Sequence, residues 1–311
     1  MKVLVTGGAG FIGSNLCRAL ASIPSVTEVV AYDDLSTGFE ANLADCPGVR
    51  LVLGDVLDVG ALRGVASGAS AIVHLAARPS VPLSLADPVA SHHVNVTGTV
   101  EVLEAARDNK AYVVVASSSA VYGDNPVSPK HEQLPQQPLS PYGVTKVATE
   151  GYAAAYQHSF GVPTLALRFF NVYGPLQPAG HAYAAVIPAF VSAALNNRPL
   201  PINGDGRQIR DFVFVDTVAQ VLTQAVLQRI TSSGPVNLAT GQPTDLLTLV
   251  KELGEVLGRP LDVELLAPRM GDIVDSRADP TLFRTLFPDI VPTERSAGLR
   301  RTVAWWQTQL G

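Results

Sequence analysis

The stretch KVLVTGGAGFIGSNL, residues 2–16, decides the fold of this 311-residue chain. A short β-branched run leads into glycines, and a segment with helical character follows them. Gly7, Gly10 and Gly13 fall at the turn and in the first helical turn. Glycines at these places let the backbone approach a pyrophosphate, which also meets the amides of the helix start. A plain tight turn with close helix packing is the alternative. The stretch predicts a strand, a turn and a helix that bind a dinucleotide.

The same alternation continues through the first half of the chain. Apolar runs typical of strands are EVVAYDD, VRLVLGD, AIVHLAA, YVVVASS and TLALRFF, at residues 28–34, 49–55, 71–77, 112–118 and 164–170. Segments of helical period separate several of them, such as residues 13–22, 94–109 and 141–161. Alternating strands and helices with apolar strands predict a parallel sheet covered on both faces. We therefore predict an α/β fold with a doubly wound, Rossmann-type parallel sheet.

The pattern changes after about residue 170. Residues 173–188 and 200–212 are rich in proline or glycine and suggest loops, and helices are predicted at 187–195, 217–228 and 246–257. This part predicts a smaller mixed α/β lobe that binds the substrate. VNLAT, residues 236–240, is predicted to return to the main sheet as a strand. The expected division is residues 1–170 for the nucleotide domain, with return segments near 209–241, and 171–208 with 242–311 for the lobe.

Composition excludes several classes of protein. The apolar runs stop well short of the roughly 20 residues that span a bilayer, so we expect no membrane segment. A net charge of −5 without basic clusters argues against a nucleic-acid surface. Cys17 and Cys46 lack metal-ligand spacing and predict neither a disulfide framework nor a metal site; we expect them to be buried or incidental. Met1 and Lys2 lead directly into the first strand, so we expect a cytosolic protein.

Two acidic residues follow predicted strands on the nucleotide side. Asp33 closes the run AYDD, where a carboxylate can accept hydrogen bonds from both ribose hydroxyls of the adenosine half. No arginine or lysine follows to bind a 2′-phosphate, so NAD is favoured over NADP. Asp55, in GDV, is the candidate to face the adenine amino group. Solvated acids at strand ends are the alternative for both.

The segment LSPYGVTK, residues 139–146, carries the second candidate site. Ser140 suits the N-cap and Pro141 the first position of a helix, so Tyr142 and Lys146 lie on one face. Packing of the tyrosine and snorkelling of the lysine is the alternative reading. A tyrosine acting as a base near neutrality needs its pKa lowered by roughly 3 units, and a nearby ammonium can supply much of that. The hydroxyls of SSSAVYG, residues 117–123, end the preceding strand at the same crevice.

Several motifs together carry a resemblance to a known family. They are TGGAGFIG, YDDLSTG, GDV, HLAA, NVTGT, SSSAVYG, SPYGVTK, RFFNVYGP, INGDGRQIRDF and RMGD. Over essentially its whole length the chain resembles the extended short-chain dehydrogenase/reductase superfamily, and within it the nucleotide-sugar 4-epimerases. The resemblance implies NAD as cofactor and oxidation of the sugar at C4 with hydride return to the other face, which makes the enzyme an isomerase.

The resemblance also implies roles for individual residues. Tyr142 is the acid/base, Lys146 its electrostatic partner and a nicotinamide-ribose ligand, and Ser118 bonds the sugar 4-hydroxyl. The expected cofactor residues are Gly7, Gly10, Phe11, Ile12, Gly13, Asp33, Asp34, Ser36, Asp55, Val56, Leu75, Ala76, Ala77, Asn95, Ser117, Tyr142 and Lys146. The expected substrate residues are Ser80, Ser118, Ser119, Asn171, Val186, Asn203, Arg210, Arg269, Asp272 and Ser276. Both arginines match diphosphate positions, to which guanidinium forks are suited.

The choice of sugar depends on the same resemblance. Dehydratases of the superfamily carry Thr-Asp-Glu where this chain has Ser118, Ser119 and Ala120, so a 4,6-dehydratase is disfavoured. GHAYAAVIPAF and PLPINGDGRQIRDF look most like the subgroup that accepts N-acetylated UDP-hexosamines, and Asn203 matches its uracil-binding asparagine. Ser276 occupies a position that is bulky in enzymes restricted to non-acetylated sugars. UDP-GlcNAc/UDP-GalNAc, and also UDP-glucose/UDP-galactose, are the expected substrates.

Departures from the pattern leave alternatives open. Pro201 stands where that subgroup has a tyrosine, and Arg78-Pro79 is unusual after HLAA. Arg78 could serve a UDP-glucuronate epimerase or decarboxylase, and another NDP-sugar of a specialised pathway would also fit. A non-catalytic dinucleotide sensor is the alternative of another class. The resemblance further implies a homodimer through helices near residues 91–108 and 141–160, whose apolar faces would equally suit docking on their own sheet.

Overall fold

The main body is a seven-stranded parallel sheet. A computed structural model describes residues 1–178, 185–268 and 274–310. The strand order is β10-β6-β5-β4-β1-β2-β3, and every neighbouring pair is parallel. The strands are β1 Lys2–Thr6, β2 Glu28–Asp33, β3 Val49–Leu53, β4 Ala71–His74, β5 Tyr112–Ser118, β6 Thr164–Phe169 and β10 Val236–Leu238. The predicted doubly wound sheet is confirmed, and so is the return of residues 236–240 to it, because β10 pairs with β6.

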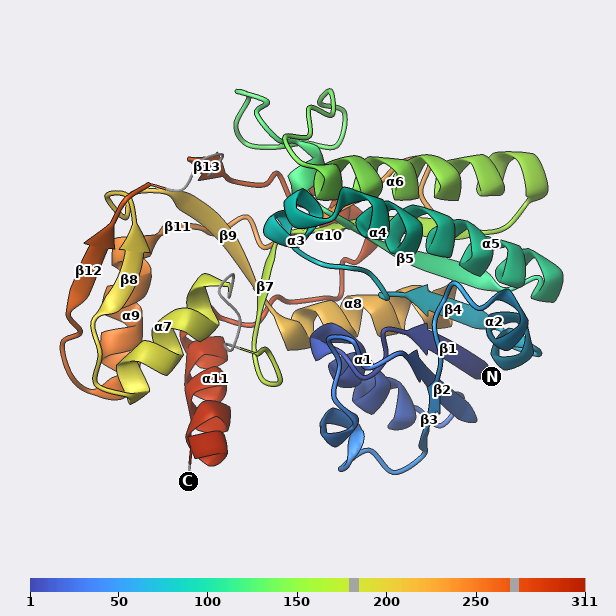
Figure 1. Ribbon diagram of the computed structural model, residues 1–311, viewed down its shortest axis with the longest axis horizontal. Coiled ribbons are helices and arrows are strands. Elements are labelled where there is room, and N and C mark those ends of the chain that lie inside the picture. Colours follow the sequence, from blue (N-terminus) through green and yellow to red (C-terminus); the bar gives the residue numbers. More distant parts are fainter. Residues whose placement is uncertain (179–184, 269–273, 311) are drawn as a thin grey trace.

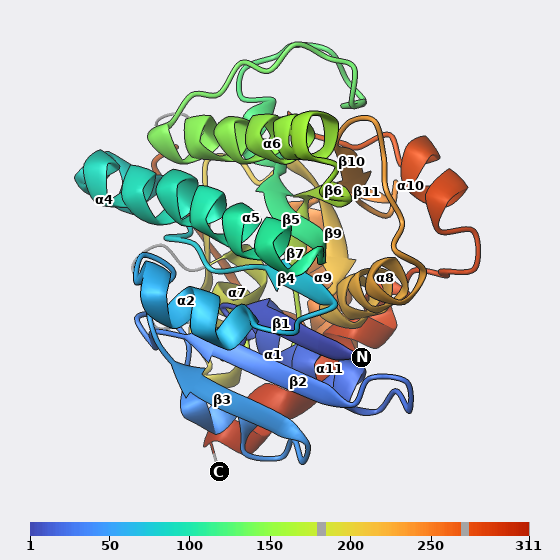
Figure 2. The ribbon, with the colours of Figure 1, turned by 90° about the vertical axis from the view of Figure 1, so that its right-hand side faces the viewer.

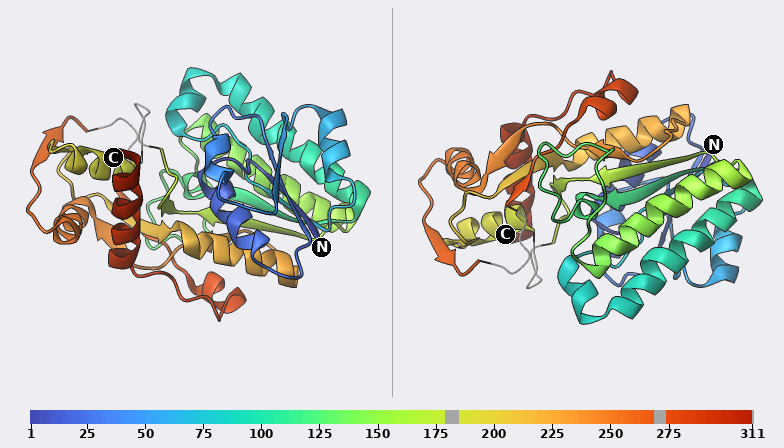
Figure 3. Two further views of the ribbon diagram at one scale, coloured as in Figure 1. Left: turned by 90° about the horizontal axis from the view of Figure 1, so that it is seen from below. Right: turned by 90° about the horizontal axis from the view of Figure 1, so that it is seen from above.

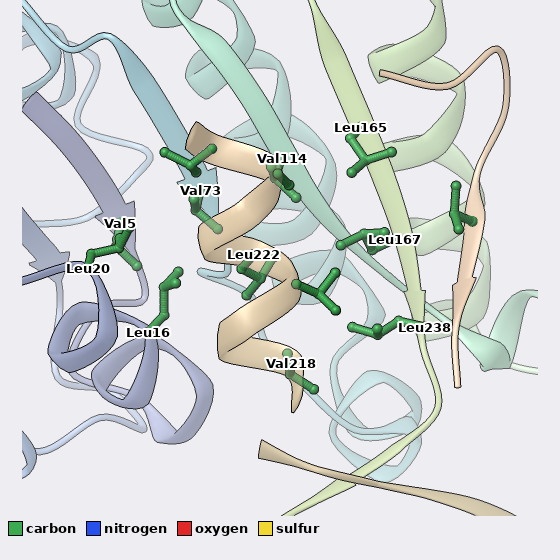
Figure 4. Packing of buried hydrophobic residues seen from close by; sticks show 14 of the residues in the cluster. Val5, Leu16, Leu20, Val73, Val114, Leu165, Leu167, Val218, Leu222 and Leu238 are labelled. Carbon is green, nitrogen blue, oxygen red and sulfur yellow. The ribbon is translucent and has the colours of Figure 1, made fainter. Parts of the chain in front are cut away.

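Helices cover both faces of this sheet (Figures 1 and 2). On one face lie α1 Phe11–Ala21 and α8 Val215–Gln228, and on the other α2 Val59–Ala66, α5 Gly98–Asn109 and α6 Pro141–Phe160. Each face has its own apolar core. Figure 4 shows the first core, where Leu16 of α1 and Leu222 of α8 point toward Val5 and Val114 of the sheet. Burying both faces explains why the strands read as continuous apolar runs.

Short helical segments complete the main body around these layers. They are η1 Glu40–Leu43, α3 Val81–Ala86, α4 Pro88–His92, the π-helical turn η2 His93–Thr97 and the 3₁₀ turn η3 Ser119–Val121. The π-turn leads directly into α5, so the predicted helix at 94–109 is confirmed with an irregular first turn. Such turns inside helices are often found at functional sites. Both α3 and α4 pack against α6.

The second part of the chain forms a smaller lobe with its own core (Figure 3). One sheet contains β7 Asn171–Tyr173, β9 Ile209–Phe214, β11 Pro243–Asp245 and β13 Asp275–Ser276; a second pairs β8 Leu200–Asn203 with β12 Val263–Leu266. Helices α7 Val186–Leu195, α9 Leu246–Leu257 and α11 Arg295–Leu310 pack around them, while α10 Thr281–Leu286 lies against β10. The interpretation of residues 200–212 as loop was wrong for both ends of the range, which form β8 and the first part of β9, whereas residues 204–208 between them form a turn. The pairing partners of the two strands lie far away in sequence and leave no local signal.

A buried carboxylate links the two parts. Asp211 of β9 is fully buried and accepts hydrogen bonds from the Thr240 amide, the Thr240 hydroxyl and the Gly241 amide, just beyond β10. The residue ranges proposed for the two domains stay a prediction. Within the predicted return segment 209–241, β9 belongs to the lobe sheet, whereas α8 and β10 lie in the main body. Cys17 and Cys46 are both buried, as expected. No helix among the described residues has the length and apolarity needed to cross a bilayer.

Candidate active site

The glycine turn after β1 is built for close backbone approach. Gly7 has a φ of +70°, and a Cβ there would lie 2.7 Å from the amide nitrogen of Ala76. A Cβ on Gly13 would lie 2.0 Å from the carbonyl oxygen of Gly7. Gly10 is the N-cap of α1 and no side chain caps this helix start. The first amides of α1, which include Phe11 and Ile12, are thus left without a side-chain acceptor, as a helix that receives a dinucleotide diphosphate requires.

Asp33 ties the glycine turn to the end of β2. Its two carboxylate oxygens accept the amides of Ala9 and Leu35, each at 2.9 Å. Burial raises the pKa of Asp33, and these backbone hydrogen bonds oppose the rise. Each oxygen keeps a further lone pair, so the carboxylate can also accept ribose hydroxyls. A buried acid here fits an unphosphorylated ribose, and the residues present therefore fit NAD.

The neighbouring acidic residues are held less tightly. Asp34 accepts the amide and the hydroxyl of Ser36, and the exposed Asp55 accepts the amide of Leu57. Val56, next to Asp55, is buried. These contacts shape the turns after β2 and β3 on the cofactor side of the sheet, at the carboxyl ends of the strands, where ligands of open parallel sheets bind.

The segment after β4 is anchored by a buried polar chain. The amides of Leu75 and Ala76 bond the backbone and the hydroxyl of Thr6, and Ala77 follows them. Asn95, in the π-turn, accepts the amide of Arg78 at 2.7 Å and donates to the hydroxyl of Thr145. This asparagine therefore connects the HLAA segment to the residue that precedes Lys146. The side chain of Asn95 is therefore fixed by hydrogen bonds within the protein and is not solvated. A residue that shapes a cofactor site needs such a fixed position.

Local signals define the start of α6. Ser140 is the N-cap and accepts the amide of Gly143 at 3.1 Å, and Pro141 occupies the first turn. The expected capping is confirmed. The amide of Tyr142 donates to Ser84 of α3 at 3.0 Å. Tyr142 is thus positioned from two sides, by its own helix start and by a neighbouring helix.

Tyr142, Lys146 and Ser118 come together at the carboxyl end of β5. Lys146 Nζ lies 5.8 Å from the ring centroid of Tyr142 and donates to the carbonyl of Ala116 at 2.8 Å. Burial raises the pKa of Tyr142, and a hydrogen bond with Ser118 opposes the rise. Burial lowers the pKa of Lys146 to about 8, although the charge of Glu150 raises it. In the protein alone the pKa of Tyr142 is thus raised and not lowered, because desolvation of the phenol dominates, and the electrostatic role of Lys146 stays a prediction.

A cavity of about 550 Å³ opens between the main body and the lobe. Ser118 and Tyr142 line it from the main body, together with Ser80, whose φ of 91° is rare for a residue other than glycine. Ser118 Oγ accepts the amide of Ala120 at 3.2 Å, and its hydroxyl also forms a hydrogen bond with Tyr142. The cavity volume is in the range of small-molecule sites.

The lobe supplies the opposite wall of this cavity. Asn171, Val186, Asn203 and Arg210 all line it, as a shared site requires. The side chain of Asn171 donates to the carbonyl of Asp211 at 3.0 Å, which ties β7 to β9. These four predicted residues come from β7, α7, β8 and β9. Their spacing in the chain does not predict that they lie together.

Other predicted residues lie apart from the cavity or outside the described part of the chain. Ser117 donates to Glu150 behind the site, and Ser119 lies in η3 without lining the cavity. Ser276 is buried in β13, paired in register with Arg210, and is not among the described residues that line the cavity. Arg269 and Asp272 lie outside the described residues.

Sequence reasoning missed several residues of the site. Gln177 lines the cavity and donates to the carbonyl of Val172, and its buried Oε1 has no hydrogen-bond partner in the described part of the chain. Ser84, which holds the amide of Tyr142, had no motif of its own. Glu150 lies four residues after Lys146, so helical spacing could have indicated it.

The fold and the site together define a class. A parallel sheet with a glycine turn after β1, an acid at the end of β2 and a Tyr-x-x-x-Lys pair at the start of α6 is characteristic of extended short-chain dehydrogenases/reductases. A family model described as the NAD dependent epimerase/dehydratase family matches residues 3–239, and the chain belongs to this family. It is an enzyme of the isomerase class, and its cofactor is NAD.

Relatives that act on three different sugars resemble the chain. A UDP-glucose 4-epimerase of Mycolicibacterium smegmatis is 40% identical over 232 residues, which are 72% of this chain and 73% of the relative. The structure of a UDP-N-acetylglucosamine 4-epimerase from Methanobrevibacter ruminantium, in complex with UDP-N-acetylmuramic acid, is 35% identical with a TM-score of 0.92 and covers 99% of this chain and 98% of that one. A UDP-glucuronic acid 4-epimerase from Bacillus cereus is 29% identical, with a TM-score of 0.89 and coverage of 99% and 100%. The chain is thus related to UDP-sugar 4-epimerases in general.

Proposed function

We propose that the enzyme interconverts the C4 epimers of UDP-N-acetylhexosamines, UDP-GlcNAc and UDP-GalNAc, and that it also accepts UDP-glucose and UDP-galactose. The main observation in support of the proposal is that one cavity is lined by Ser118 and Tyr142 on one side and by Asn203 and Arg210 on the other. A nucleotide sugar needs both ends, because the sugar must meet the phenol while the nucleotide and its diphosphate are held by the lobe.

In the proposed mechanism, Tyr142 takes the proton of the sugar 4-hydroxyl and later returns it. Ser118 bonds the same hydroxyl and keeps it directed toward the phenol. Lys146 supplies a positive charge 5.8 Å from the ring centroid of Tyr142, which would favour the phenolate and act against the burial that raises the pKa of Tyr142. NAD, when bound, would supply the hydride chemistry at C4 of the sugar. The glycine turn and Asp33 would hold its adenosine and diphosphate half, and Lys146 its nicotinamide ribose.

Epimerisation further requires the 4-keto sugar to turn over while the nucleotide stays bound. Arg210 is proposed to bind the diphosphate and Asn203 the uracil, at the lobe end of the cavity. Arg269, which the resemblance assigns to the same diphosphate, and Asp272 lie outside the described residues. The sugar end is lined by small or neutral side chains such as Ser80, Ala120 and Asn171, which leaves freedom for rotation.

Two observations support an N-acetylated sugar. Ser276 provides a small side chain at the position that the resemblance makes bulky in enzymes restricted to non-acetylated sugars, and it lies in β13 in register with the cavity-lining Arg210. The solved 4-epimerase that carries UDP-N-acetylmuramic acid matches this chain over nearly its full length. A carboxylated sugar is less well supported, because Arg78, the cation considered for it, is not among the described residues lining the cavity. Ser119 and Ala120, in place of an acid and a base, speak against a dehydratase.

The decisive experiment is incubation of the purified protein with UDP-GlcNAc, UDP-glucose and UDP-glucuronate in separate samples, each followed by proton NMR for the C4 epimer. The proposal expects turnover of UDP-GlcNAc, slower turnover of UDP-glucose and none of UDP-glucuronate. Epimer formed only from UDP-glucuronate, or from no nucleotide sugar, would refute it. NAD binding without any turnover would point to the dinucleotide sensor.

We also propose that the enzyme is a homodimer in the cytoplasm. The outer surfaces of α4 and α6, which pack against each other, expose Val89, Val144, Tyr152 and Phe160. Such apolar side chains on neighbouring helices suit a two-fold contact. Sedimentation equilibrium tests this: the dimer mass is expected, and Val144→Glu combined with Tyr152→Glu is expected to give the monomer.

A further inference from the structure

A buried ion pair lies directly behind the Tyr142–Lys146 pair. Glu150 is one turn after Lys146 on the inner side of α6, and it is 5% exposed. Arg168 of β6 is 1% exposed and binds it with two parallel hydrogen bonds, from Nε and Nη2, each of 2.8 Å. Both charges are therefore removed from water, which is costly unless every polar atom finds a partner.

The carboxylate is fully satisfied by further donors. Ser117 Oγ donates to Glu150 Oε1 and Gln136 Nε2 to Oε2, each at 2.5 Å. The guanidinium of Arg168 also stacks on Tyr122, with 4.7 Å between Cζ and the ring centroid. Stability alone is a weak reason to bury such a pair, because well-packed apolar residues of similar volume often serve as well or better.

The position of the pair suggests a second reason. The end of β5 is tied to α6 at two successive residues, by Lys146 at the carbonyl of Ala116 and by Glu150 at the hydroxyl of Ser117. The next residue is Ser118, which lines the cavity. Glu150 therefore links the strand that carries Ser118 to the helix that carries Tyr142.

Glu150 also determines the charge around Lys146. The groups that face this lysine are Tyr142 and Glu150 on its own helix, His74 from β4, and the carbonyl of Ala116 from β5. His74 is kept uncharged by its burial, which lowers its pKa to about 3. Among the described residues that act on Lys146, Glu150 thus provides the negative charge.

We propose that Glu150 is a positioning residue of the epimerase, whose buried carboxylate, fixed by Arg168, keeps Lys146 protonated and holds the Ser118 strand against Tyr142. The proposal rests on the proposed function of the Tyr142–Lys146 pair. Replacing the carboxylate by an amide should lower the pKa of Lys146, so that the ammonium is lost at a lower pH. The activity should then fall at a lower pH on the basic side, because the protonated lysine is the form that supports Tyr142.

The test reads Lys146 directly. The chain has five lysines, so the full-length protein labelled with [ε-¹³C]lysine gives few signals, and Lys146→Arg assigns the one of interest. The midpoint of Lys146 is measured with and without saturating NAD in the wild type, Glu150→Gln, and Glu150→Gln with Arg168→Met. The single variant leaves the buried charge of Arg168 unpaired, whereas the double variant removes both charges. The double variant therefore still gives a result if the single variant does not fold. Glu252→Gln is the matched control, since Glu252 binds Arg295 through two bonds of 2.6 Å in the lobe.

The expected result is a downward shift of the Lys146 midpoint by about one pH unit, tenfold in the protonation equilibrium, in Glu150→Gln, with a smaller shift of the same sign in the double variant. In the control Glu252→Gln, the midpoint of Lys146 is expected to equal that of the wild type. A Lys146 midpoint unchanged in both Glu150 variants would overturn the proposal. The basic limb of kcat with UDP-GlcNAc should move with the NMR midpoint while KM stays constant, and a limb that stays in place would also overturn it. If the wild type shows no turnover at all, the epimerase function is refuted. The lysine titration still tests the proposal for Glu150 in that case, because it does not depend on turnover.

Discussion

Lys146 Nζ lies 5.8 Å from the ring centroid of Tyr142 and donates a 2.8 Å hydrogen bond to the carbonyl of Ala116. The lysine is therefore anchored on the strand that ends in Ser118, and it acts on the tyrosine through its charge. A protonated Lys146 would favour the phenolate form of Tyr142, whose pKa burial raises. The proposed role of the pair therefore requires that Lys146 stays protonated.

Removal of the phenol hydroxyl tests the role of Tyr142. Tyr142→Phe is expected to reduce kcat for the C4 epimerisation of UDP-GlcNAc by about 10³-fold, since general acid–base catalysis contributes roughly 10²–10⁴-fold. The fold should be kept because the ring stays and the amide still donates to Ser84. Turnover is measured by proton NMR and NAD binding by calorimetry. Activity close to that of the wild type would exclude the phenol as the acid/base.

A methyl group in the glycine turn should abolish cofactor binding. Gly13→Ala would place a Cβ 2.0 Å from the carbonyl oxygen of Gly7, so the start of α1 must move away from the turn. We expect NAD affinity to fall by at least about 100-fold in calorimetric titrations.

Gly151→Ala is the matched control for that variant. A Cβ at Gly151, inside α6, meets no atom within 4 Å. This substitution should leave NAD affinity unchanged and raise the free energy of unfolding by up to about 1 kcal/mol, because glycine is unfavourable within helices. Equal loss of NAD affinity in both variants would show that the effect is not specific to the turn.

A bulky residue at position 276 should change the sugar preference. Ser276→Tyr is expected to remove turnover of UDP-GlcNAc while sparing that of UDP-glucose, because the resemblance implies that a bulky residue at this position restricts the enzyme to non-acetylated sugars. The two rates are measured on the same preparation by NMR. Loss of both activities, or of neither, would count against a role of this position in sugar choice.

The stability of the protein should depend on pH through His74. This histidine is buried between the hydroxyls of Thr6 and Thr99, and burial lowers its pKa from 6.5 to about 3. A depressed folded-state pKa means that the contribution is fully present above pH 6.5 and is lost as the pH falls toward 3. From pH 7 to 5 the free energy of unfolding should drop by about 2 kcal/mol on account of His74.

Urea unfolding at the two pH values measures this drop. His74→Gln is expected to be less stable at pH 7, because it loses a fitted ring between Thr6 and Thr99, but to decline less between pH 7 and 5. A variant that loses as much stability over this interval as the wild type would show that other groups govern the acid side.

Much of the site was predictable because its signals are local. The glycine turn follows its strand directly, Ser140 and Pro141 mark the helix start, and Tyr142 and Lys146 share a face through helical spacing alone. The lobe was less predictable. Residues 200–212 were interpreted as loop, since β8 and β9 pair only with strands distant in sequence and their short runs carry no clear alternation.

The sequence by itself determined the parallel sheet and the cofactor end and indicated the candidate reacting groups, because each depends on a few neighbouring residues and on the period of the apolar pattern. The tertiary structure decided what these groups can do. It brings Asn203 and Arg210 to the cavity of Tyr142, it raises the pKa of the phenol by burial, and it places the Glu150–Arg168 pair behind Lys146. Cavities, desolvation and long-range charge pairs arise only when segments distant in the chain exclude water together.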